Sequence, residues 1–193
     1  MDKSPLQKLA PELRNRIYEA VLVSDSCLVT TCENAWFGPI LPTATQPLIT
    51  KVCKQMREET LRLFYNSNTF QILLQIPGND ANTPSKQTLD ARNWLLKVDP
   101  ECHKSVKILN LYLEFEVLCS AFRDTLRNVT AELKLLSKLL HRCGYNSSRL
   151  QLTVVMDGYY GLDSYLQRGI VEEWIQDIGL GATVRIWIGG SET

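Results

Sequence analysis

The sequence predicts an α/β fold in which a helical N-terminal unit is followed by alternating helices and strands. Residues 69–76 alternate apolar and polar side chains, as a half-buried strand does. Beyond residue 86, helical apolar stripes and short strand-like runs follow each other in turn. The strands begin roughly every 35 to 40 residues, which leaves room for a helical crossover. We therefore expect a mostly parallel sheet covered by helices, with an α+β arrangement as the alternative.

Two helices are expected in the N-terminal unit. Pro11 suits the first turn of a helix, because a proline there loses no intrahelical hydrogen bond. One face of this helix is apolar and consists of Leu13, Ile17, Ala20 and Val21. A second helix is predicted over 48–65. The segment 24–47 between them is rich in Pro, Gly, Ser and Thr and is predicted to be a loop with a short strand near 27–31.

The remaining elements follow a segment rich in Gly, Asn and Pro at 77–86, which is the candidate domain boundary. It would separate a region 1–76 from a region 87–190, and the two can also pack as one compact unit. The elements predicted beyond it are a helix at 91–98, a strand at 106–115, a helix at 126–140, a strand at 149–156, a helix at 166–178 and a strand at 183–188.

Three sequence blocks lie in order within the N-terminal region: 9–18 (LAPELRNRIY), 48–59 (LITKVCKQMREE) and 64–70 (FYNSNTF). They resemble the fungal F-box-like family that is marked by two E-x-R elements, and the resemblance covers about residues 4–76. An F-box docks a Skp-type adaptor through its Leu-Pro turn and the helices that follow. The partner-binding residues that the resemblance implies are Leu6, Leu9, Pro11, Leu13 and Ile17.

The resemblance implies a non-enzymatic protein-interaction module of the cytoplasm or nucleus, which recruits a target to a ubiquitin ligase. Two positions depart from the family pattern: Ala10 stands where proline is usual, and Lys54 replaces an arginine. The loop at 24–47 is also longer than the connection in an F-box proper. These departures favour the alternative of a scaffold or regulatory domain with no link to a ligase.

Charged residues in the matching blocks are expected to form structural ion pairs between the two helices. Glu12 can bridge to Arg57, and Arg14 can bridge to Glu58 or Glu59. Such pairs fix the register of packed helices and are worth about 0–1 kcal/mol each when exposed. The functional alternative is a bidentate arginine that holds a carboxylate of a partner.

Aromatic pairs in two predicted loops are further interface candidates. Trp36 and Phe37 lie in the first loop, and Tyr159 and Tyr160 follow the strand at 149–156. The second loop also carries Asp157 and Asp163 at a sheet edge where ligands of parallel α/β sheets bind, so a small-ligand binder or enzyme is a third reading. Its glycines lack the spacing of a phosphate-binding loop.

Composition and motifs narrow the classes of function. Basic and acidic residues number 21 each, so no global field attracts nucleic acid or an anionic membrane. No stretch of eighteen apolar residues predicts a membrane span. Catalytic motifs are missing, and the two histidines match no zinc-binding spacing with their neighbouring cysteines. We expect free thiols, no cofactor or metal, and a protein partner, and the sequence predicts no oligomeric state.

Overall fold

The computed structural model describes residues 5–34, 38–77, 85–116, 122–157, 164–188 and 191–192. The helical elements are the 3-10 helices η1 (Pro5–Lys8) and η2 (Leu48–Lys51) and the α-helices α1 (Pro11–Leu22), α2 (Lys54–Ser67), α3 (Lys86–Lys97), α4 (Pro100–Ser105), α5 (Phe122–Arg142) and α6 (Ser164–Ile178). The strands are β1 (Cys27–Leu28), β2 (Cys32–Asn34), β3 (Gly38–Ile40), β4 (Phe70–Pro77), β5 (Leu109–Glu116), β6 (Leu150–Asp157), β7 (Thr183–Ile188) and β8 (Ser191–Glu192).

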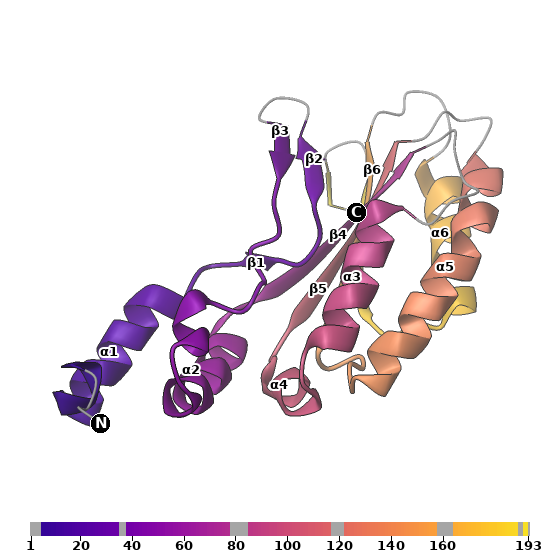
Figure 1. Cartoon of the computed structure of the whole chain (residues 1–193). Coiled ribbons are helices and arrows are strands. Elements are labelled where there is room, and N and C mark those ends of the chain that lie inside the picture. Colours follow the sequence, from indigo (N-terminus) through magenta and orange to yellow (C-terminus); the bar gives the residue numbers. More distant parts are fainter. Residues whose placement is uncertain are drawn as a thin grey trace.

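The main sheet has the order β1-β4-β5-β6-β7-β8 (Figure 1). Neighbouring strands from β1 to β7 run parallel, and only β8 runs antiparallel to its neighbour. Helices connect β4, β5, β6 and β7 in turn. The predicted α/β fold with a mostly parallel sheet is therefore confirmed.

Helices cover one face of this sheet. Every second strand residue is buried on that face, and aromatic contacts connect the strands to the helices. Trp94 of α3 lies 5.4 Å from Phe70 between ring centroids, and Trp174 of α6 lies 5.6 Å from Phe115. Helix α5 lies between α3 and α6 and contacts both. Its apolar stripe, predicted from the leucine spacing, is buried against the sheet at Leu126, Leu133, Leu136 and Leu140.

Local capping explains one prediction that was wrong. The single helix predicted over 48–65 is divided into η2 and α2. Cys53 stands between them with extended backbone (φ −157°), and its Sγ accepts a bond from the Met56 amide at 3.5 Å. A thiol is an unusual helix N-cap, so the sequence carries no recognisable start signal at Cys53. The apolar periodicity also continues across the break, which is why one helix was predicted.

Two short elements were not predicted. The segment 24–47 contains a small hairpin in which β2 and β3 pair antiparallel. Helix α4 follows α3 almost directly, because Asp99 caps it by accepting from the Glu101 amide at 2.8 Å and Pro100 occupies its first turn. A helix of six residues is too short to give a periodic apolar signal.

The sheet and the core both continue across the candidate boundary at 77–86. Strands β4 and β5, on either side of it, pair along eight residues each. A cluster of aromatic rings joins α2 (Phe64 and Tyr65), β4 (Phe70) and α3 (Trp94). The N-terminal helices and the helix–strand repeats therefore share one hydrophobic core.

A buried polar cluster closes the end of the sheet where β5 and β6 begin. The His103 Nε2 donates to the Leu95 carbonyl at 3.0 Å, so its Nδ1 accepts from the Tyr145 hydroxyl at 3.0 Å. Burial lowers the pKa of His103, the Leu95 bond opposes this shift, and nearby Arg149 adds to it. Arg149 lies over the Tyr145 ring, 5.0 Å from its centroid, and donates to the carbonyls of His103, Val106 and Gly144.

Candidate functional site

Helix α1 packs against α2 at the end of the molecule that holds the N-terminus (Figure 1). Its inward face carries Tyr18 and Leu22, which are 2% and 3% exposed. The Asn68 side chain anchors the end of α1 by donating to the Leu22 carbonyl at 2.8 Å. The apolar residues Leu13 and Val21 lie beside this inward face, on a flank of α1 that is exposed to solvent.

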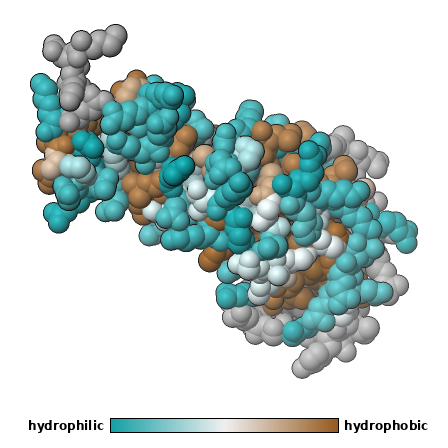
Figure 2. All heavy atoms as spheres, turned by 90° about the horizontal axis from the view of Figure 1, so that it is seen from below, coloured by the Kyte–Doolittle hydropathy of each residue, from teal (hydrophilic) through white to brown (hydrophobic). Residues whose placement is uncertain are grey.

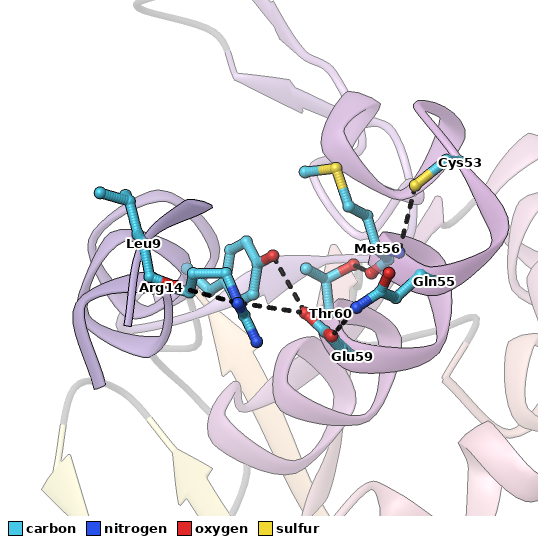
Figure 3. Close-up of polar contacts among 8 residues, drawn as sticks. Leu9, Arg14, Cys53, Gln55, Met56, Glu59 and Thr60 are labelled. Carbon is cyan, nitrogen blue, oxygen red and sulfur yellow. Dashed lines mark hydrogen bonds and ion pairs between the residues drawn. The ribbon is translucent and has the colours of Figure 1, made fainter. Parts of the chain in front are cut away.

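Glu59 of α2 is the centre of a polar network that holds α1 (Figure 3). Its carboxylate accepts a hydrogen bond from the Tyr18 hydroxyl at 3.1 Å and lies 3.9 Å from Nε of Arg14. On its own helix, Glu59 accepts from the Gln55 amide at 2.9 Å. Burial and the bond to Glu59 raise the pKa of Tyr18, so this hydroxyl stays a donor at all physiological pH values. We call Arg14, Tyr18 and Glu59 the helix lock.

Further side-chain hydrogen bonds lie next to the helix lock, at the start of α1 and within α2. Arg14 also donates from its guanidinium to the Leu9 carbonyl at 3.1 Å, which fixes the turn before α1 (Figure 3). On α2, the Thr60 hydroxyl donates to the Met56 carbonyl and the Cys53 thiol caps the helix. The relative position of α1 and α2 is therefore determined by side-chain bonds as well as by apolar contact.

Replacing Glu59 with alanine is expected to lower the free energy of unfolding by about 1–2 kcal/mol, because it leaves the Tyr18 hydroxyl without a partner in a buried position. Urea denaturation followed by circular dichroism measures this change. The matched control is Glu58→Ala, whose carboxylate forms only an exposed pair with Lys54 at 3.9 Å. That variant should change the stability by less than about 0.5 kcal/mol. Equal effects of the two substitutions would contradict the helix lock.

An apolar stripe of three residues, Leu13, Ile17 and Val21, follows the outer face of α1 at intervals of four residues. Leu13 is 50% exposed and Val21 is 61% exposed, while Ile17 is partly buried. Leu48 of η2, 79% exposed, lines a pocket of about 750 Å³ together with Val21. Figure 2 shows apolar residues at the surface of this end of the molecule, on the left, among hydrophilic neighbours.

The five residues implied as partner-binding lie in η1, α1 and the turn between them. Pro11 and Leu13 are exposed, and Leu9 and Ile17 are partly buried. Leu6 is also partly buried and packs against the core.

The predicted ion pairs are formed only in part. Arg14 was expected to pair with Glu58 or Glu59, and in the structure it pairs with Glu59. The bridge from Glu12 to Arg57 is wrong: Arg57 Nε donates to the Thr50 carbonyl at 3.0 Å, and exposed Glu12 has no ion pair among the described residues. Glu58 pairs with Lys54 on its own helix. The reason is helix rotation, because α1 turns Arg14 and Tyr18 rather than Glu12 toward α2.

The remaining candidates fall outside the described residues. Trp36 and Phe37 belong to the undescribed residues 35–37, and Tyr159, Tyr160 and Asp163 belong to the undescribed residues 158–163. These interface and ligand predictions therefore stay predictions.

Sequence reasoning placed Val21 on the apolar face of α1, but it missed Tyr18 and Leu48 as parts of the site. Tyr18 belongs to the first matching block, and its four-residue spacing from Arg14 and Leu22 was the available signal for the inward face. Leu48 was predicted to be the first residue of a helix that in fact starts six residues later, at Lys54.

No family model matches this chain, and no curated protein or solved structure matches it significantly. Across the described ranges, no helix combines the length and apolar character that crossing a membrane requires. Within the same ranges, no three His, Cys, Asp or Glu side chains gather as they would around a metal ion.

Proposed function

We propose that this chain is a protein-interaction module that binds a protein partner through the apolar stripe of α1 and the adjoining Leu48. The observation that carries the proposal is the solvent exposure of the stripe on a helix whose other face is locked to α2. The sequence resemblance makes a Skp-type adaptor the expected partner, and the helix–strand repeats would then present the target.

The physical case rests on the chemistry of the stripe. Burying a fully exposed Leu, Ile or Val side chain contributes about 1.5–3 kcal/mol, so the stripe supplies a favourable term that offsets part of the entropic cost of association. Large apolar residues that stay exposed together on one helix face are typical of binding surfaces, whereas single exposed ones are common everywhere. Spacings of four and eight residues along the helix suit a groove or helix face on the partner.

The helix lock supports the same proposal. A surface that is already ordered before binding loses less conformational entropy when a partner arrives. Glu59, Tyr18 and Arg14 hold the backbone of α1 without using any residue of the stripe. The scaffold alternative uses the same surface with a different partner, so the two versions differ only in what binds.

Isothermal titration of the purified chain with a purified fungal Skp-type adaptor tests the proposal. We expect a saturable complex, and we expect Leu13→Asp with Val21→Asp to weaken it by at least about a hundredfold, because two carboxylates would be desolvated. The matched control is Leu135→Asp, at a leucine on α5 that is 54% exposed, close to the 50% of Leu13.

The outcomes separate the versions of the proposal. Equal weakening by the stripe variant and by Leu135→Asp would show that the stripe is not the binding surface. Absence of any complex with the adaptor would remove the ligase version. Circular dichroism of each variant must first show the helical content of the unchanged protein.

A further inference from the structure

Within the part of the chain that the structure describes, one face of the main sheet is left without a helical layer. The strands β4, β5, β6 and β7 are neighbours in the same order as in the sequence. Crossovers between parallel strands are right-handed, so connections that all move in one direction place all their helices on the same side. The aromatic contacts of α3 and α6 with Phe70 and Phe115 are on that side. In Figure 1 the helices α3 and α5 lie in front of the strands.

The strand residues of the other face form three rows across β4 to β7. They retain solvent exposure, and all are partly buried except Thr183 and Arg185, which are exposed. The strand register gives the rows Gln71–Asn110–Gln151–Thr183, Leu73–Tyr112–Thr153–Arg185 and Gln75–Glu114–Val155–Trp187. We call these twelve residues the open face.

An open face is unusual in this class of fold. Parallel sheets occur almost only with both faces covered. The open face also has the composition of an interface, since it contains Tyr, Trp and Arg but no Lys or Asp and only one Glu. With one acid and one base it does not attract a polyanion such as a nucleic acid.

The apolar residues of the open face form one diagonal band. Leu73 and Tyr112 are neighbours in the middle row, and Val155 and Trp187 are neighbours in the next row. The band therefore crosses all four strands. Glu114 lies on one side of it, where it accepts a hydrogen bond from Gln75 at 3.0 Å. Arg185 lies on the other side, two strands away, or about 10 Å.

We propose that the open face binds the open face of a second copy of this chain, with a two-fold axis along the apolar band. Such an axis places each side of the band opposite the other side in the second copy. Glu114 of one copy then lies opposite Thr153 and within side-chain reach of Arg185 of the other, and the same pair forms twice. The bands pack on each other, so the sheet of each copy gains the second layer that its own helices do not supply.

The area of the open face determines how tightly we expect the two copies to bind. Its rows cover four strands about 4.8 Å apart and six residues of about 3.3 Å each, or roughly 400 Å² in plan. This is small for a protein interface, so we expect a reversible dimer with a dissociation constant of about 1–100 μM. The inference does not depend on the function proposed for α1, which lies at the far end of the molecule.

Sedimentation velocity of the full chain, from about 1 to 300 μM, tests the inference around the expected dissociation constant. We expect a concentration-dependent dimer. Glu114→Arg and Arg185→Glu should each weaken it by at least about tenfold, because each places like charges opposite one another. The double variant carrying both substitutions should restore the affinity to within about threefold, because it exchanges the two partners of the same pair.

The matched control is Lys138→Glu, a charge reversal at an exposed position of α5 in the helical layer. It should leave the dissociation constant unchanged within about twofold, since it lies outside the open face. A protein that stays monomeric over the whole range would overturn the inference. So would single variants that dimerise like the unchanged chain, or a double variant weaker than either single one.

Discussion

Replacing Arg149 with alanine is expected to lower the free energy of unfolding by about 3 kcal/mol. The guanidinium bonds the carbonyls of His103, Val106 and Gly144 and lies over the Tyr145 ring. Val106 is 1% exposed, so its carbonyl cannot gain a water in place of the lost donor without opening the core. A buried polar group without a partner costs about 1–3 kcal/mol, and the Val106 carbonyl loses its donor, whereas the His103 carbonyl keeps the hydrogen bond from the Val106 amide at 3.2 Å.

Two companion variants sharpen this result. Arg149→Lys keeps the charge but lacks the planar fork, so it should recover less than half of the lost stability. Arg142→Ala removes an exposed arginine at the end of α5 and should change the stability by less than about 0.5 kcal/mol. Chemical denaturation at neutral pH measures all three, and similar losses for Arg142 and Arg149 would contradict the assigned contacts.

Phe70→Ala is expected to have the largest effect on stability, a loss of about 3–5 kcal/mol. The ring is fully buried and stacks on Tyr65 at 5.4 Å between centroids, with Phe64 in an edge contact and the Trp94 ring tilted by 35° relative to it. It joins α2, β4 and α3, and its removal should destabilise the N-terminal helices and the sheet together. We therefore expect one cooperative transition at a lower denaturant concentration.

The comparison variant is Leu96→Ala, at a leucine of α3 that is largely exposed. It should cost less than about 0.5 kcal/mol. Two probes distinguish one transition from two: far-ultraviolet circular dichroism follows the helices, and tryptophan fluorescence follows the surroundings of the four tryptophans, which include the buried Trp94 and Trp174. Two separate transitions for Phe70→Ala would mean that regions 1–76 and 87–190 unfold independently, in contrast to their shared core.

Several elements of the fold followed directly from apolar periodicity. The strand at 69–76 and the helix at 126–140 were predicted within a few residues, because a strand with one buried face and a helix on a sheet both give a clean period. The break at Cys53 and the short helix α4 depend on single capping bonds, which periodicity does not register. The described helices lie on one face of the sheet because of the order of the strands, which is a long-range property.

The candidate site was likewise predicted only in part from the sequence. The apolar face of α1 was visible in the sequence, but its direction was not, because Tyr18 and Arg14 on the other face determine which side packs inward. The pairing of Arg14 was predicted only as a choice between two glutamates. The predicted bridge between Glu12 and Arg57 was wrong because opposite charges in the sequence do not indicate which side of each helix faces the other helix.

Hydrogen–deuterium exchange of the chain with and without an excess of Skp-type adaptor tests the central claim, that the outer face of α1 binds a partner. We expect added protection of the amides in 11–22 and 48–52, and none in β5 or β6. Protection confined to the helix–strand repeats, or no change in 11–22 under saturating adaptor, would contradict it.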